Sequence, residues 1–97
     1  MVEVVTLIRR DWSGAERQET RRDVLCRLAS VGYREFYASS ASEYHPEIKF
    51  ILSDYLDYND ETLALHNGTL YRILRTYRTG QELELTAERA PAEEATP

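Results

Sequence analysis

The side chains able to support catalysis or metal binding are few and widely separated in this sequence. The histidines are His45 and His66, and the single cysteine is Cys26. None of the three stands at the spacing from a second Cys, His or carboxylate that structural or catalytic zinc sites require. We therefore expect His66 to have no metal partner and Cys26 to be a small core residue.

An acidic stretch comes closest to a cation site. Asp57, Asn59 and Glu61 alternate as the first ligands of a calcium loop do, but Thr62 stands where such a loop needs its glycine, and the distal glutamate is missing. The sequence also lacks a Gly-x-Ser-x-Gly elbow, and its four glycines are isolated, so it offers no phosphate-binding loop. We expect a protein that is not an enzyme and that holds no cofactor and no metal.

The densest basic cluster is Arg72, Arg75 and Arg78. On a regular strand Arg72 and Arg78 share one face, and Arg75 points the other way. One interpretation pairs these arginines with acids of neighbouring strands such as Glu82 and Glu84. The other places them in a ring of arginines at a subunit or partner interface.

Aromatic residues supply the other interface candidates. The chain has seven tyrosines, two phenylalanines and Trp12, and tyrosine suits subunit contacts because its ring is apolar and its hydroxyl polar. Trp12 either folds back over the end of the domain or faces a partner. Tyr33, Phe36 and Tyr37 have i, i+3, i+4 spacing, which predicts a short helix over residues 33–41 and adds them to the candidate interface.

Alternation of apolar and polar residues predicts the elements that position these side chains. We predict strands at residues 2–8, 23–29, 47–53, 62–65, 69–77 and 82–88. Residues 70–77 also fit helical spacing, but the preceding Asn67-Gly68 favours a type I′ hairpin turn and therefore a strand. Residues 9–22 and 54–61 are predicted connections, and the second half of 9–22 can already be extended.

The predicted fold class is mainly β. We expect a small antiparallel β-barrel or sandwich of about five to six strands, with one short α-helix between the second and third strands. Residues 1–88 form this single domain, and residues 89–97 form a flexible C-terminal tail because they carry two prolines and no large apolar side chain.

Charge and cysteine content limit the functional class. The 97 residues carry a formal net charge of −5, with 17 acidic and 12 basic side chains, so the net field does not attract a phosphate backbone. The lone cysteine excludes an intrachain disulfide, and the sequence has neither a signal peptide nor the roughly 20 apolar residues that span a bilayer. We expect folding in a reducing cytoplasm and no membrane contact.

Several motifs, taken in order, resemble the head closure, or head-tail adaptor, proteins of long-tailed phages. They are Val-Thr-Leu-Ile near the amino terminus, Arg-Glu-Phe-Tyr, His-Pro-Glu-Ile-Lys-Phe, Leu-His-Asn-Gly-Thr-Leu-Tyr-Arg and Glu-Leu-Glu-Leu. The resemblance covers about residues 4–88. The sequence departs from the family in the charged segment 9–22 and in the acidic tail.

The resemblance implies a structural virion protein of the phage neck. Such a protein forms a homo-oligomeric ring below the portal, joins the DNA-filled head to the tail and helps to retain or gate the genome. Its partners would be portal or adaptor proteins and tail-completion proteins, with DNA passing non-specifically through the lumen. It would be made in the host bacterial cytoplasm and located in the virion.

Two segments have predicted roles in this ring, and one other function stays open. The loop at residues 39–47 projects into the lumen or toward a neighbouring ring, and the tail at 90–97 docks on a neighbouring protein. The candidate lumen-facing residues are Ser39, Ser40, Ser42, Glu43, Tyr44 and His45. The alternative is a monomeric small β-barrel module that binds a peptide or oligonucleotide through Tyr71, Tyr77 and the arginines.

Overall fold

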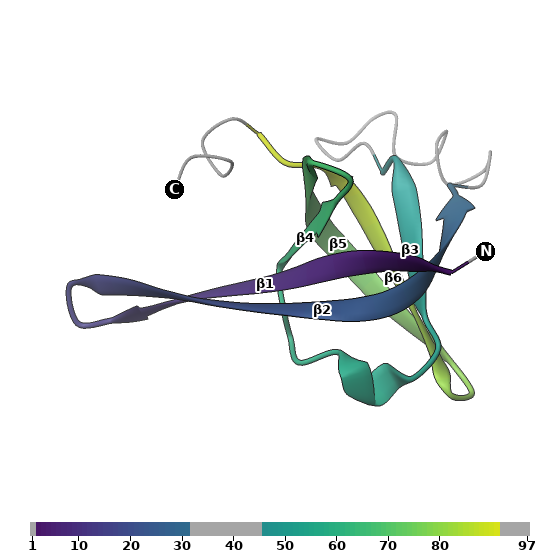
Figure 1. The fold of residues 1–97 in the computed structure, drawn as a ribbon, viewed down its shortest axis with the longest axis horizontal. Helices are drawn as coiled ribbons and strands as arrows, with labels where there is room; N and C mark the ends of the chain where they lie inside the picture. The colour runs from purple at the N-terminus through teal and green to yellow at the C-terminus, as the bar shows by residue number, and fades with distance from the viewer. Residues whose placement is uncertain (1, 32–45, 92–97) are drawn as a thin grey trace.

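The computed structural model describes residues 2–31 and 46–91. Six antiparallel strands form a closed barrel in the order β1-β2-β3-β6-β5-β4 (Figure 1). The elements are β1 (Glu3–Ser13), β2 (Glu16–Ser30), β3 (Ile48–Leu52), the 3-10 turn η1 (Tyr55–Asp57), β4 (Leu63–His66), β5 (Thr69–Thr79) and β6 (Glu82–Arg89). The predicted mainly β class is confirmed, whereas the predicted helix at 33–41 lies outside the described residues.

The barrel interior is filled by one alternating face of each strand. Phe50 of β3 lies opposite Leu28 of β2 and Leu85 of β6 and is fully buried. The ring of Tyr71 meets that of Phe50 edge-on at a centroid distance of 5.6 Å. The buried cluster consists of Val5, Leu7, Cys26, Phe50, Leu52, Ala64, Leu83, Leu85 and Ala87. The predicted core position of Cys26 is therefore confirmed.

The β4–β5 hairpin has the predicted turn. Asn67 and Gly68 have φ values of 52° and 82°, and His66 pairs with Thr69 across them. Positive φ at both central residues defines a type I′ turn, whose twist matches that of the flanking strands. Because the turn sets the register, it also settles residues 70–77 as a strand rather than a helix.

One end of the barrel is closed by η1, which lies in the predicted connection at 54–61. The Asp54 carboxylate accepts a hydrogen bond from the Leu56 amide at 2.9 Å and so caps the turn. The Tyr55 amide donates to the Gln81 carbonyl at 2.8 Å, which ties η1 to the β5–β6 turn. Arg78 of β5 places its guanidinium 3.5 Å from the centroid of the Tyr55 ring.

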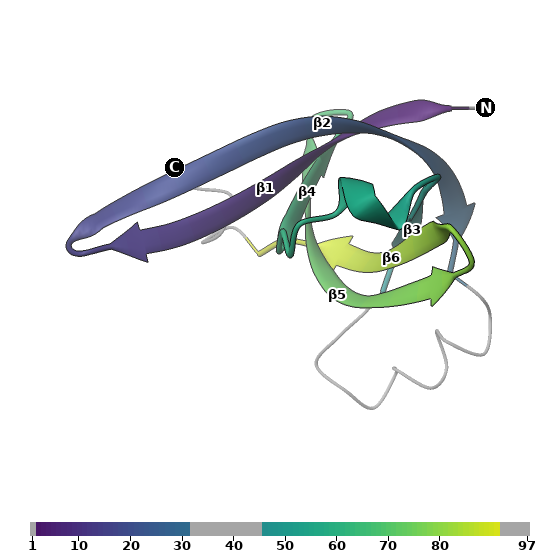
Figure 2. The same cartoon turned by 90° about the horizontal axis from the view of Figure 1, so that it is seen from below.

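The prediction that residues 9–22 form a connection is wrong. Strand β1 pairs with β4 only from Thr6 to Ile8, and β2 pairs with β3 only from Cys26 onward, yet β1 and β2 pair with each other as far as Ser13↔Glu16. Residues 9–20 therefore form a two-stranded ribbon that extends away from the barrel in both views (Figures 1 and 2). We call these residues the arm.

The arm lacks apolar periodicity because it has no face to bury. Alternation of apolar and polar residues marks strands with one covered face, and the described side chains of β2 from Glu16 to Arg21 are all exposed. The hairpin is instead set by its turn, where Gly14 has a φ of 64°. Positive φ at the first central residue is typical of the two-residue type II′ turn.

The buried cysteine gives a pH-dependent stability that can be measured. Burial, with a smaller contribution from the Glu3 carboxylate, raises the pKa of Cys26 to about 11. Both the folded and the unfolded thiol are neutral below pH 9. As pH rises toward 11 the unfolded thiol ionises first, so stability falls by about 1.4 kcal/mol per pH unit, roughly 2 to 3 kcal/mol in all.

We expect Cys26→Ala to lose this dependence while keeping a constant cost for the missing sulfur. Urea unfolding of both proteins between pH 8 and pH 11, under reducing conditions, measures it. The free energy of unfolding of the wild type should exceed that of Cys26→Ala by less and less as pH rises. Titrations of the other side chains occur in both proteins and cancel in this difference. An advantage that stays the same across this range would contradict the burial of the thiol.

Candidate functional site

The arm carries a chain of exposed ion pairs. Arg10 Nε lies 2.9 Å from Glu19 Oε1 across the two strands, and Arg21 Nε lies 2.7 Å from Glu19 Oε2 along β2. Hydrogen bonds from Arg21, and then from Arg10, hold the pKa of Glu19 below its usual value. The network keeps both strands of the ribbon in register, although each exposed pair contributes little stability.

A buried carboxylate anchors the arm to the barrel. Arg22, opposite Leu7 and thus on the inner face of β2, donates from Nε and Nη2 to Glu61 Oε2 at 2.9 and 2.6 Å. The same Nη2 donates to the Asp57 carbonyl at 2.6 Å. Only 2% of the Glu61 side chain is exposed, whereas 38% of the Arg22 side chain is, so this pair joins β2 to the η1–β4 segment through a carboxylate that is itself shielded from water.

Glu61 also organises its own segment. Its Oε1 accepts the Asn59 amide at 2.6 Å, and its carbonyl accepts the Tyr58 hydroxyl at 2.7 Å. Burial raises the pKa of Tyr58, and the nearby charges of Asp60 and Glu61 raise it further, so the phenol remains a donor at neutral pH. The acidic stretch considered above as a calcium loop is thus a structural turn folded around Arg22.

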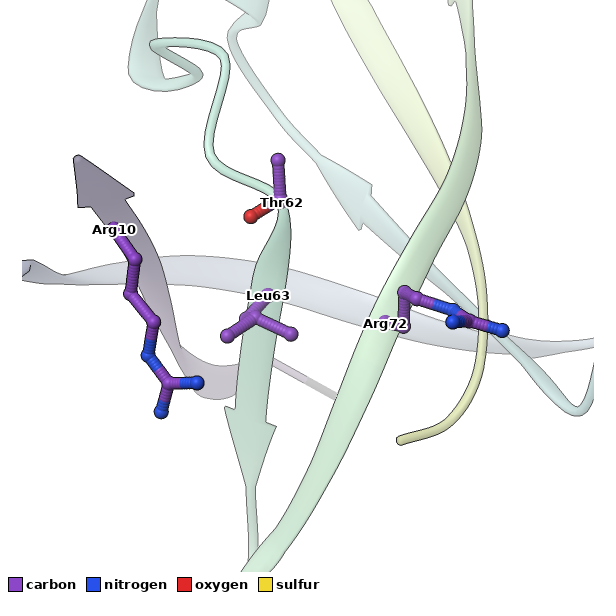
Figure 3. Close-up of a pocket in the computed structure, with 4 residues that line it drawn as sticks. All are labelled: Arg10, Thr62, Leu63 and Arg72. Atoms are coloured by element: carbon purple, nitrogen blue, oxygen red, sulfur yellow. The ribbon is translucent and has the colours of Figure 1, made fainter. Parts of the chain in front are cut away.

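A pocket of about 210 Å³ lies where the arm leaves the barrel. It is lined by Arg10, Thr62, Leu63 and Arg72, with the two arginines on either side of Leu63 (Figure 3). Arg10 is paired with Glu19, and Arg72 is paired with Glu88 of β6. Because both guanidinium groups have carboxylate partners, we interpret the pocket as the junction between arm and barrel rather than as an anion site.

A β-bulge in β5 alters the predicted faces of the arginine cluster. The register shifts between Ile73 and Arg75, leaving Leu74 without a counterpart on β6. An extra residue in one strand reverses the face of every later side chain. Sequence alternation alone cannot detect this change.

The bulge separates Arg78 from the other two arginines. Arg72 lies opposite Glu88 and Arg75 opposite Thr86, so both are on the outer face of β5, whereas Arg78 lies opposite the buried Leu83. The prediction that Arg72 and Arg78 share a face is therefore wrong. The expected acidic partners also differ, because Glu82 and Glu84 pair with Arg27 and Lys49 instead.

The remaining predicted interface residues divide between the arm and the undescribed segment. Trp12 belongs to β1, and its backbone pairs with Arg17 near the far end of the arm. The segment around it therefore runs outward and does not fold back over the barrel. The predicted interface residues Tyr33, Phe36 and Tyr37 and the predicted loop residues Ser39, Ser40, Ser42, Glu43, Tyr44 and His45 lie outside the described residues.

The histidine of the barrel, His66, contacts neighbouring side chains of the fold. His66 Nε2 lies 3.0 Å from Glu3 Oε1, beside the ring of Phe50. Within residues 2–31 and 46–91, no group of three or more His, Cys, Asp or Glu side chains is arranged to hold a metal ion. The described part of the chain also has no helix with the length and apolar character needed to cross a membrane.

Sequence reasoning missed the arm as a unit, although one signal for it exists. Gly14-Ala15 can form a two-residue turn, and folding the chain about it places Arg10 opposite Glu19. Cross-strand charge pairing about a glycine therefore could have identified this hairpin. The role of Glu61 as the partner of Arg22 had no local signal, because the two residues are far apart in the sequence.

Removing the anchor should destabilise the fold much more than removing an exposed pair. We expect Glu61→Gln to lower the free energy of unfolding by about 2 to 4 kcal/mol, because the buried carboxylate that accepts the hydrogen bonds of Arg22 and of the Asn59 backbone N–H is then lost. Glu19→Gln is the matched control and should cost less than about 1 kcal/mol. Urea denaturation of the two variants measures both values, and equal costs would contradict the anchoring role of Glu61.

Comparison with known proteins does not assign the chain to a family. No protein-family model matches the chain, and no curated protein matches it significantly. The functional interpretation therefore depends on the arm, its anchor and the motif order of the sequence.

Proposed function

We propose that this chain is a structural protein of the neck of a long-tailed phage, of the head closure or head-tail adaptor type. In this proposal a ring of identical subunits sits below the portal, joins the filled head to the tail and helps to retain the genome. Its partners are the portal or adaptor proteins above and the tail-completion proteins below. The resemblance of the ordered sequence motifs is the starting point.

The single observation that carries the proposal is the arm. A two-stranded ribbon is only marginally stable when isolated in water, yet here the pairing continues past the last contacts with β3 and β4 to Ser13↔Glu16. A projecting element of this kind gives each subunit of a ring a means of contacting its neighbour. The buried Arg22–Glu61 pair fixes the base of the arm, so force on the arm would be transmitted to the barrel.

The closed barrel suits a mechanical role. Within the barrel every strand has a hydrogen-bonded neighbour on each side over part of its length, which limits the edges that could pair indiscriminately. The net charge of −5 agrees with DNA that passes through a lumen without being gripped, because phosphate contacts would slow its passage. We therefore assign the chain to the virion, with DNA as a non-specific passenger.

The experiment that tests the proposal is cryo-electron microscopy of particles made with and without this gene. We expect particles that lack the protein to be filled heads without tails that lose DNA, and purified protein to restore tailed particles. Normal tailed particles without the gene would overturn the proposal. Salt-sensitive binding of a peptide or oligonucleotide by the purified chain would then favour the monomeric β-barrel module.

An arm-shortened variant tests the carrying observation in the same assay. Deleting residues 10–13 and 16–19 removes an even number from each strand, so every remaining side chain keeps its face and Arg9↔Thr20 closes on Gly14-Ala15. We expect this variant to fold with a stability within about 1 kcal/mol of the wild type and to fail in rescue. Leu56→Ser, at an exposed position of η1, is the control that should rescue.

A further inference from the structure

Strand β2 presents a long edge, in the arm and in the adjoining residues 21–25, with no strand neighbour among the described residues. Strand β2 pairs with β1 on one side along its length, but its other side pairs with β3 only from Cys26 onward. The edge of β2 from Glu16 to Leu25 therefore has no strand partner in the described ranges. Edges of this kind are templates for the addition of another strand.

The hairpin geometry determines which main-chain groups this edge offers. In a two-residue hairpin the pair flanking the turn exchanges hydrogen bonds, and the pairs then alternate. Ser13↔Glu16 flanks the turn here, so the even-numbered residues of the arm in β2 bond to β1. The odd-numbered residues direct their N–H and C=O groups to the open side. These residues are Arg17, Glu19, Arg21 and Asp23.

The same four residues carry charges of alternating sign on one face. Asp23 accepts the Thr6 hydroxyl at 2.6 Å across the strands, and Glu19 binds both Arg10 and Arg21. Cys26 faces the core, so the odd-numbered side chains of β2 point to the outer face. The open edge thus combines free hydrogen-bonding groups with a repeating positive and negative pattern.

We propose that two copies of this chain pair through the open edges of β2, antiparallel and centred on Thr20. The central four strands of the dimer would be β1-β2-β2-β1. Centring on Thr20 sets Arg17 opposite Asp23 of the second copy and Glu19 opposite its Arg21, and twofold symmetry repeats both pairs. All four outer-face charges then meet an opposite charge, and all four residues present main-chain groups to one another.

Neighbouring registers are disfavoured by charge. A dimer centred on Glu19 or on Arg21 sets that residue opposite its own copy and brings further like charges together. A dimer centred on Gln18 keeps only the ion pair between Arg17 of one copy and Glu19 of the other. A dimer centred on Arg22 sets the two copies of Arg22 opposite each other. The alternating charges along β2 therefore favour one register of the dimer and disfavour pairing with unrelated strands.

This dimer goes beyond the proposed neck function and does not depend on it. It concerns the purified chain in solution, where the open edge has no strand partner among residues 2–31 and 46–91. A dimer that covers this edge would have to open before the arm could contact a neighbour in a ring. Dimerisation and head closure are therefore tested separately, and either can fail without the other.

A single cysteine at the centre tests the register. Residues directly opposite in a non-hydrogen-bonded pair have Cα atoms about 4.5 Å apart, which is within the range for a disulfide. We expect Thr20→Cys, in a Cys26→Ala background that leaves one thiol, to form a covalent dimer on mild oxidation. Gln18→Cys in the same background is the control, because its two copies would lie four residues apart along the strands, about 13 Å.

Charge reversal tests the pairing in solution by sedimentation at increasing protein concentration. We expect Arg17→Glu to weaken the dimer at least about tenfold, because two like-charge contacts replace two ion pairs. The double variant Arg17→Glu with Asp23→Arg should restore it. Arg89→Glu makes the same change in charge away from the arm and should leave it unaffected, and added salt should weaken the wild-type dimer.

Two results would overturn the proposal. One is a wild-type chain that remains monomeric at about 1 mM, which is far above the concentration at which a specific interface of ordinary strength forms. The other is crosslinking at Gln18→Cys that equals or exceeds that at Thr20→Cys. Circular dichroism of every variant checks that the barrel is intact, so that loss of the dimer is not loss of the fold.

Discussion

The burial of one carboxylate, that of Glu61, determines how the barrel and its arm are joined. A charged group excluded from water requires partners, and Glu61 finds them in Arg22 and in the Asn59 amide. These contacts hold the segment between η1 and β4 against the inner face of β2. They add to the contacts that tie η1 to the β5–β6 turn, and they fix the position of β2 at the base of the arm.

Strands β1 and β2 are stabilised by different interactions near the barrel and in the arm. Near the barrel, β1 and β2 bury Val5, Leu7 and Cys26, and the removal of apolar area from water stabilises them. Beyond Ile8 they have no core to join, and cross-strand pairs such as Arg10 and Glu19 keep them in register. Each exposed pair contributes less than buried apolar area does, so the arm is the part of the fold best suited to change partners.

These properties connect the proposed neck function with the proposed dimer. Both depend on a ribbon in which the edge of β2 has no strand partner among the described residues and carries charges that restrict what can bind there. An uncharged edge of the same length would be prone to aggregation. The alternating charges of β2 disfavour unrelated strands at this edge, which has no strand partner among the described residues.

Local sequence predicted the strands that have one covered face. Phe50 and Leu85 belong to alternating runs, and Asn67-Gly68 identified the hairpin turn, because burial on one face and positive φ both leave a local pattern. For the candidate interface the sequence named residues but not the element that carries them. Trp12 and Arg72 lie in the arm and at its junction with the barrel, but the arm itself was mistaken for a connection.

Only the tertiary structure decided the rest. The bulge at Leu74 moved Arg78 away from the face of Arg72, and nothing in the sequence around it marks an extra residue. The Arg22–Glu61 pair joins residues that are distant in the chain, so no local spacing predicts it. Composition and alternation thus determined that this chain is a small, mainly β domain. Long-range pairing decided that the sheet closes into a barrel and where the barrel ends and the arm begins, because an exposed ribbon has no buried face to leave a pattern.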